Sequence, residues 1–396
     1  MQKNNYEELL PVDPIGAINK MKENYWRYFN TMYRFNSHEP GLDDKRRKAL
    51  EDPNGKVACR DPYVEMLPEY QSMGKKLEQC IDSDVQLKSA FSAFPEYVKF
   101  IEAGLMSYPP YKHQVDMLKT AYLGINGNHN TIITSGTGSG KTESFMLPLL
   151  ASLLKEAKTW PSQDYSTDWM SKDSYDQPYQ RQGEQGDHAA IKALVMYPMN
   201  ALVADQLTRL REALDSDSVR KVLDTDFNGN RIFFGQYNSA TIGGSKTLPD
   251  YAALGTRKMQ KACKAIAMKV SSLSSSAKSV RSHIAEKLWQ LHSAKINHGV
   301  TSDEYKKAKK EYDKAKGAQY IAPRVREGKV TSEMVTRWDM QACPPDILIT
   351  NYSMLSIMMM RHTEKDMIEK TRAWFEADPL RDTDQPSRVF HLIIDE

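Results

Sequence analysis

The stretch Thr134–Thr142 reads Thr-Ser-Gly-Thr-Gly-Ser-Gly-Lys-Thr, which is the pattern of a glycine-rich phosphate-binding loop. Backbone N–H groups of such a loop curl around the β- and γ-phosphates, and side chains at the three glycines would obstruct them. Lys141 supplies a positive charge, and Thr142 supplies a hydroxyl ligand for magnesium. The pattern predicts a nucleoside triphosphate site whose residues are Ser135, Gly136, Thr137, Gly138, Ser139, Gly140, Lys141 and Thr142.

The flanking sequence supports this interpretation. The β-branched run Thr131–Ile133 before the loop predicts a short strand, and Glu143–Lys155 after it is apolar at helical spacing. A helix that begins at the loop offers its N-terminus to an anion. Two features depart from the general pattern: Ser135 stands where Gly or Ala is usual, and Pro148 lies inside the helix, where it can introduce a kink.

The composition is that of an ordinary globular protein. The chain has 396 residues, 40% hydrophobic and 27% charged, which is enough for two or three domains. No stretch approaches the roughly 18 apolar residues of a membrane span, and the N-terminus lacks the apolar core of a signal peptide. We therefore expect a cytoplasmic protein with no membrane partner. Its four cysteines show no metal-ligand spacing and are expected to be free.

The pattern of elements changes along the chain. Residues 1–104 show helical periodicity and predict a helical N-terminal module, whereas residues 105–396 alternate strands with helices. That alternation predicts an α/β lobe with a parallel sheet covered by helices on both faces. The expected strands are Thr131–Thr134, Ala193–Tyr197, Arg231–Phe234, Ile347–Thr350 and Val389–Ile394.

Two polar segments are predicted to be surface insertions, about residues 161–187 and 245–337. Between Lys246 and Lys329 there are 19 Lys and Arg against 7 Asp and Glu, a local excess of 12 positive charges. Ser302–Lys316 predicts a long exposed helix. A basic insertion of this kind can contact phosphates, or its lysines can serve solubility alone, and the sequence leaves both interpretations open.

The run Val389–Ile394 ends in two carboxylates, Asp395 and Glu396. An Asp at the end of a core strand beside a phosphate loop holds magnesium, and a following Glu can polarise the attacking water. We therefore expect Thr142 and Asp395 at the metal, and Lys141, Asp395 and Glu396 in catalysis.

Further segments, taken in order, resemble motifs of superfamily 2 helicases of the DEAD/DEAH-box class. Tyr108–Gln114 resembles the adenine-reading motif, which makes Gln114 the residue that would bond the base edge. Tyr197–Gln206 resembles a strand-to-helix motif that holds nucleic acid by its phosphates. The resemblance places nucleic-acid contacts at Pro198, Asn200, Ala201, Gln236, Tyr237, Thr350, Asn351 and Tyr352.

Three segments are similar in sequence to the large bacterial helicases of anti-phage defence, in the Druantia and DISARM systems, and to Lhr-type DNA helicases. They are Thr137–Phe145, Trp338–Gln341 and Thr350–Leu355. This resemblance implies a RecA-like lobe, cofactors ATP and Mg²⁺, ATP hydrolysis, and sequence-independent contacts to the DNA backbone. It also implies a partner subunit of a defence system.

That family needs a second lobe with an arginine finger, so we expect the residues up to Glu396 to form an incomplete first lobe that hydrolyses ATP slowly by itself. A second hypothesis stays open. The chain can be a non-motor ATP-binding switch that scaffolds a DNA-binding or protein assembly.

Overall fold

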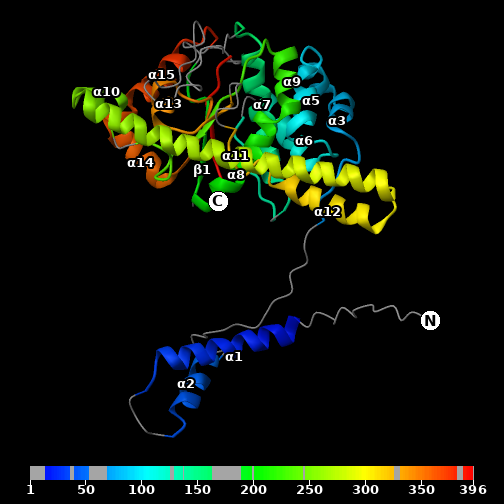
Figure 1. The fold of residues 1–396 in the computed structure, drawn as a ribbon, viewed down its shortest axis with the longest axis vertical. Coiled ribbons are helices and arrows are strands. Elements are labelled where there is room, and N and C mark those ends of the chain that lie inside the picture. Colours follow the sequence, from blue (N-terminus) through cyan, green and yellow to red (C-terminus); the bar gives the residue numbers. More distant parts are fainter. Residues whose placement is uncertain are drawn as a thin grey trace. The chain divides into compact units, whose positions relative to one another are not determined.

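The computed structural model describes residues 14–35, 40–52, 69–124, 129–136, 138–162, 189–198, 200–243, 246–324, 331–380 and 387–395. The chain forms two compact units, Met1–Glu69 and Tyr70–Glu396. Figure 1 shows the ribbon of both units.

The first unit is a pair of helices, α1 (Pro14–Met32) and α2 (Leu42–Glu51). Trp26 is its buried apolar side chain, and its indole nitrogen donates a hydrogen bond to Glu51 Oε1 at 2.9 Å. Arg47 of α2 forms an ion pair with Glu23 of α1 at 2.5 Å. One aromatic side chain and a few exposed charge pairs therefore hold the two helices together.

The second unit is built on a five-stranded sheet in the order β3-β2-β4-β1-β5, and all its strand pairs are parallel. The strands are β1 (Ala193–Tyr197), β2 (Phe234–Gln236), β3 (Glu333–Met334), β4 (Ile347–Asn351) and β5 (His391–Ile394). The predicted α/β class with a parallel sheet is confirmed.

Side chains of the central strands alternate between two cores, as the two-residue period of a strand requires. Val195 and Ile349 belong to the larger core, whereas Leu194 and Leu348 face the smaller one. Both faces are therefore buried, which is why the strands are continuously apolar.

Helices cover each face of the sheet (Figure 1). The larger core packs under α3 (Leu77–Ser83), α4 (Val85–Phe91), α5 (Glu96–Gly104), α6 (Lys112–Leu118) with the following π-helical turn Lys119–Leu123, α7 (Lys141–Ala157), α8 (Asn200–Asp215) and α9 (Asp217–Asp226). The smaller core packs under α13 (Arg337–Ala342), α14 (Tyr352–Met360), the 3-10 turn His362–Glu364 and α15 (Lys365–Glu376).

The observed strands differ from the predicted ones at several positions, and β5 begins at His391 rather than Val389. Thr131–Thr134 forms no strand: β5 is the last strand of the sheet, no described strand pairs with this segment, and Ile132 is 92% exposed. β2 begins at Phe234 rather than Arg231, because a side-chain acceptor, Asp346 Oδ2, binds the backbone N–H of Phe233 at 2.8 Å. The edge strand β3 lies within the predicted insertion and is too short to show a period.

The boundary between the units lies near residue 69, whereas the sequence pattern placed the end of the helical module at residue 104. Helices α3 to α5 pack into the larger core; for example, the hydroxyl of the fully buried Tyr97 donates to Leu147 O at 3.0 Å. The division of the chain into a functional module and a motor lobe stays a prediction.

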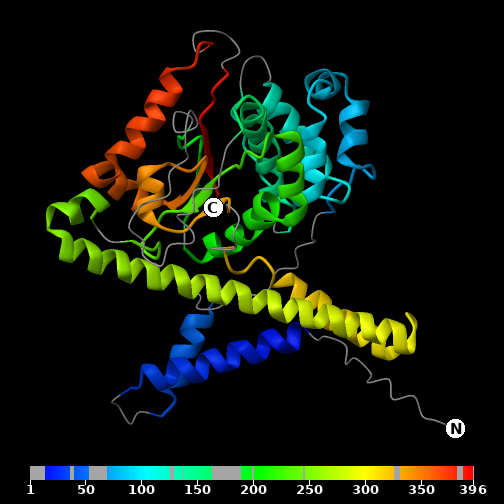
Figure 2. The ribbon, with the colours of Figure 1, turned by 45° about the horizontal axis from the view of Figure 1, so that its top comes forward.

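The basic insertion contains α10 (Leu248–Ala253), α11 (Thr256–His298) and α12 (Asp303–Gly317). In both Figure 1 and Figure 2, α12 runs back beside the second half of α11, so the two form an antiparallel hairpin. The predicted helix at residues 302–316 is confirmed. Of the other predicted insertion, residues 163–187 lie outside the described residues.

Two expectations from composition can be compared with the structure. In the part of the chain that the structure describes, none of the helices has the length and hydropathy needed to cross a bilayer. Cys80, Cys263 and Cys343 form no disulfide among the described residues, and Cys59 lies outside them.

Candidate nucleotide site at the carboxyl edge of the sheet

The phosphate loop has the backbone shape that its glycines predict. Gly138 and Gly140 have φ values of 77° and 75°, a left-handed conformation that side chains disfavour. A Cβ at Gly140 would also lie 2.3 Å from Nε2 of Gln114. Helix α7 begins at the next residue, Lys141, so its free N–H groups open directly onto the loop. This is the arrangement that binds a phosphate.

Side chains of α6 and of the loop itself fix the position of the loop. Nε2 of His113 lies 2.8 Å from the carbonyl oxygen of Ser139, at hydrogen-bond distance. The hydroxyls of Ser135 and Ser139 lie 2.6 Å apart and share a hydrogen bond. Ser135, the departure from the usual Gly or Ala, thus ties the two ends of the loop together. Thr137 lies outside the described residues.

Gln114 lies beneath the loop and is 1% exposed. Its Oε1 accepts the backbone N–H of Tyr111 at 2.8 Å, and its Nε2 donates to the carbonyl of Gly140 at 3.1 Å. These two bonds give Gln114 a role in holding the loop. The contact of Gln114 with adenine stays a prediction. One hydrogen on Nε2 and one lone pair on Oε1 remain available for that contact.

Lys141 and Thr142 occupy the first turn of α7. Lys141 is half-buried and forms no ion pair with any described residue, so its charge is available to a phosphate. The hydroxyl of Thr142 accepts a hydrogen bond from Nε2 of Gln206, on α8, at 3.2 Å. A second pair, Arg209 with Glu143 at 3.0 Å, also joins α8 to this turn.

Asp395 follows β5 at the carboxyl edge of the sheet, where open parallel sheets bind ligands. Its backbone N–H donates to Met196 O at 3.0 Å, which holds it beside β1. Burial, and then the negative charge of Asp395, raise the pKa of the Tyr197 phenol well above its usual value. Asp395 therefore lies close to Tyr197. No described contact joins Asp395 to the phosphate loop, and Glu396 lies outside the described residues.

The residues present fit a magnesium ion. Magnesium prefers oxygen ligands and is usually held by one or two carboxylates together with substrate phosphates. Thr142 Oγ1 keeps a lone pair after accepting from Gln206, and no described side chain is paired with the Asp395 carboxylate. Among the described residues there is no cluster of three or more His, Cys, Asp or Glu side chains, so the phosphates would complete the coordination.

The predicted nucleic-acid residues divide into interior and exposed groups. Tyr237 and Thr350 are fully buried: the Tyr237 hydroxyl donates to Glu364 at 2.8 Å, and the Thr350 hydroxyl donates to Tyr237 O at 2.7 Å. Asn351 caps α14 by accepting from Met354 N at 2.7 Å, and Tyr352 is 73% exposed. Tyr237 and Thr350 therefore form internal hydrogen bonds that hold the ends of β2 and β4. Their contact with nucleic acid stays a prediction.

The other candidates lie at the ends of β1 and β2. Pro198 is exposed, and α8 begins at Asn200 just after it, which gives the helix N-terminus that the motif predicts. Gln236 is partly exposed at the end of β2. The side chains of Asn200 and Ala201 lie outside the described residues, so only their backbone can be placed.

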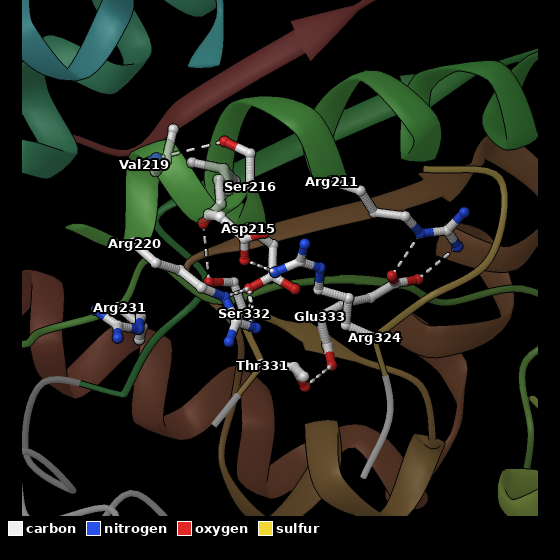
Figure 3. A network of polar contacts seen from close by, with 12 residues as sticks. Arg211, Asp215, Ser216, Val219, Arg220, Arg231, Arg324, Thr331, Ser332 and Glu333 are labelled. Atoms are coloured by element: carbon white, nitrogen blue, oxygen red, sulfur yellow. Dashed lines mark hydrogen bonds and ion pairs between the residues drawn. The ribbon is translucent and has the colours of Figure 1, made fainter. Parts of the chain in front are cut away.

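A network of buried charges lies at the other end of α8 (Figure 3). Arg211 binds both oxygens of Glu333, at 2.6 and 2.8 Å, and also donates to the carbonyl of Tyr320, in the segment after α12. Asp215 accepts from Arg220 at 2.7 Å and from the backbone N–H of Ser332 at 3.2 Å. Helix α8 thus contacts the nucleotide turn through Gln206 and the base of the insertion through Arg211. Sequence reasoning missed Gln206 and Arg211, because nothing in their spacing reveals partners so distant in the chain.

Residues 111–242 match the family model described as DEAD/DEAH box helicase. The match confirms the resemblance expected from the motifs, and it covers the phosphate loop and the start of α8. The chain is also similar to Druantia protein DruE from Escherichia coli (strain UMEA 4076-1), at 26% identity over 371 residues. The aligned region is 92% of this chain and 18% of DruE, so the chain spans less than a fifth of that relative's length. No solved structure matches the chain.

Proposed function

We propose that residues 105–396 form the first ATP-binding lobe of a DNA helicase or translocase of anti-phage defence. The observation that carries the proposal is the left-handed Gly138 and Gly140 directly before the start of α7, beside Lys141, which forms no ion pair with a described residue. A nucleoside triphosphate is the ligand that fits this combination of backbone N–H groups and charge.

The residues have distinct roles in this proposal. The N-terminus of α7 and Lys141 bind the β- and γ-phosphates, and Gln114 with His113 keeps the loop in its binding shape. Thr142 and Asp395 would hold Mg²⁺, which when bound neutralises charge that develops on the phosphates. Glu396 would orient the attacking water. ATP hydrolysis would then move the protein along a DNA strand held by its backbone, and Gln236, Asn351 and Tyr352 are the available contacts at the same edge.

Two other parts of the proposal rest on resemblance. DruE is named as a Druantia protein, which supports a role in defence and a partner subunit of such a system. We also keep the cytoplasm as the expected location.

A non-motor switch is the second candidate function, and the geometry of α8 favours it. One helix contacts Thr142 of the nucleotide turn and, through Arg211, the strand β3 at the base of the insertion. Nucleotide binding could then change how the insertion is held without driving movement. DNA-stimulated ATP hydrolysis distinguishes the candidates, because a switch does not need DNA to accelerate turnover.

The test is ATP hydrolysis by the intact protein, with and without DNA. We expect hydrolysis that DNA stimulates, and Lys141→Ala should lower it on the order of 100-fold, as loss of one preorganised charge contact does. Lys155→Ala, an exposed lysine at the other end of α7, is the matched control and should keep the activity. A rate of ATP hydrolysis that DNA does not increase, or that Lys141→Ala does not lower, would contradict the motor proposal.

A further inference from the structure

The first half of α11 carries positive charge on its solvent side without any negative charge. Its exposed cations are Arg257, Lys258, Lys261, Lys264, Lys269 and Lys278, which we call the α11 stripe. We propose that the α11 stripe binds the phosphate backbone of duplex DNA. The inference rests on the proposed function only in taking DNA as the partner, and it concerns a surface separate from the ATP site.

The opposite side of the same helix is firmly anchored. Ile266, Ala267 and Val270 are buried with Trp338, and the indole nitrogen of Trp338 donates to Lys246 O at 3.0 Å. Since a helix has 3.6 residues per turn, this spacing defines one buried face and leaves the cations on the other. The stripe is therefore held rigidly on the body of the second unit.

The charges of the stripe form no ion pair with the residues that the structure describes. Residues 251–285 include no Asp or Glu, and none of the six cations forms an ion pair with a described residue. The hairpin partner α12 differs, because it also carries carboxylates, at Asp303, Glu304, Glu311 and Asp313, and Lys306 pairs with Asp303 at 3.4 Å. Unpaired cations in a row are suited to phosphates, where binding releases counterions.

The location of the stripe agrees with a role in DNA binding. The anchored half of α11 packs against Ile242, Val335 and Trp338, which follow the carboxyl ends of β2 and β3. All strands are parallel, so Gln236, at the end of β2, and Asp395, at the end of β5, lie at that same edge of the sheet. DNA on the stripe would therefore reach the edge where the motor is expected to grip a strand.

The stripe suits a duplex better than a single strand. Proteins that hold single strands use aromatic side chains on which bases stack. Residues 252–288 include no Phe, Trp or Tyr. From Arg257 to Lys269 the helix rises about 18 Å, the length of roughly five base pairs. Cations spread over the exposed side of a rigid helix can contact a duplex backbone over that length.

The test compares two variants with equal charge changes. The stripe variant carries Lys258→Gln, Lys261→Gln, Lys264→Gln and Lys269→Gln. The control carries Lys306→Gln, Lys307→Gln, Lys309→Gln and Lys310→Gln on α12. Binding to a fluorescent 25-base-pair DNA duplex, and separately to one of its single strands, is measured by anisotropy without nucleotide, at several salt concentrations. Circular dichroism verifies that both variants are folded.

We expect the stripe variant to lose at least about tenfold in duplex affinity, with a salt dependence smaller by up to about 3.6 in slope, since each of the four phosphate contacts contributes about 0.9. The control should lose less than about threefold. Equal losses in the two variants, unchanged affinity in the stripe variant, or a loss confined to single-stranded DNA would overturn the proposal. Because no nucleotide is present, this result is independent of whether the chain hydrolyses ATP.

Discussion

The two ends of the helical insertion hold their charges in different ways. At the root, Arg211 and Glu333 lie 2.6 Å apart and their side chains are only 10% and 6% exposed. Toward the tip, Lys287 of α11 and Glu311 of α12 lie 2.8 Å apart, at 20% and 44% exposure. The nitrogen–oxygen distances in the two ion pairs are similar, so the pairs differ chiefly in how far their side chains are buried. A buried pair that loses one partner leaves a charge without solvent, whereas water replaces a lost partner at the surface.

This difference assigns separate roles to the two ends. The root fixes where the insertion leaves the sheet, because Arg211 joins α8, the segment after α12, and β3. The tip contributes solvated charge and little stability. An insertion with a rigid root and a solvated tip can present a surface in a defined place, as the α11 stripe requires.

The largest effect is expected at the root. Arg211→Met leaves Glu333 buried without its partner and should lower the free energy of unfolding by about 3–5 kcal/mol, measured by urea denaturation. Arg209→Met is the matched control on the same helix, since Arg209 is 44% exposed and its loss should cost less than about 1 kcal/mol. Equal effects for the two arginines would remove the distinction between buried and exposed pairs.

The imidazole of His391 tests the cost of burying an unpaired charge through the pH dependence of stability. Burial, and then the neighbouring His129, lower the pKa of His391 on β5 to about 4. Nε2 of His391 has no hydrogen-bond partner among the described residues. Below about pH 6.5 the unfolded chain binds a proton at His391, whereas the folded chain does not. The free energy of unfolding should therefore fall as the pH is lowered from about 6.5 to about 4. The loss is at most about 3 kcal/mol.

His391→Gln should reduce this acid sensitivity when thermal unfolding is followed from pH 7 to pH 4.5. The exposed His298, at the end of α11, supplies the control His298→Gln, which should retain it. If both variants follow the wild-type profile, burial of His391 is not the source of the acid sensitivity.

The smallest effect is expected at the tip. Lys287→Gln removes the pair with Glu311, and urea denaturation should show no measurable change in the free energy of unfolding. The pKa of Glu311 is lowered chiefly by its hydrogen bond with Lys287, so the variant should raise that pKa, which carboxylate NMR can follow. A destabilisation as large as that of Arg211→Met would show that the hairpin, rather than its root, holds the insertion.

Sequence patterns predicted the parts of the fold that depend on local burial. Ala193–Tyr197 and Ile347–Asn351 are apolar on both faces and form the strands expected of them. Thr131–Thr134 is also rich in β-branched residues and forms no strand, because a strand needs a hydrogen-bonded neighbour and composition does not supply one. β3 was missed for the opposite reason: pairing with β2 defines it, and two residues carry no period.

The candidate site shows the same limit. Glycine spacing predicted the loop because the left-handed conformation is a local requirement, and the structure has it at Gly138 and Gly140. The contact between Arg211 and Glu333 joins residues 122 positions apart, and no pattern in one sequence reveals such a pair. Burial of Tyr237 likewise depends on Gln341 and Glu364, which only the folded chain brings to it.

The most direct test of the central claim is stabilisation by Mg-ATP. A ligand at one hundred times its dissociation constant stabilises the state that binds it by about 2.7 kcal/mol, which raises the unfolding temperature measurably. We predict that Mg-ATP raises the unfolding temperature of the wild-type chain and of Lys155→Ala, and that Lys141→Ala loses most of the shift. No shift in the wild-type chain, or an equal shift in Lys141→Ala, would contradict the assignment of Ser135–Thr142 as the phosphate site.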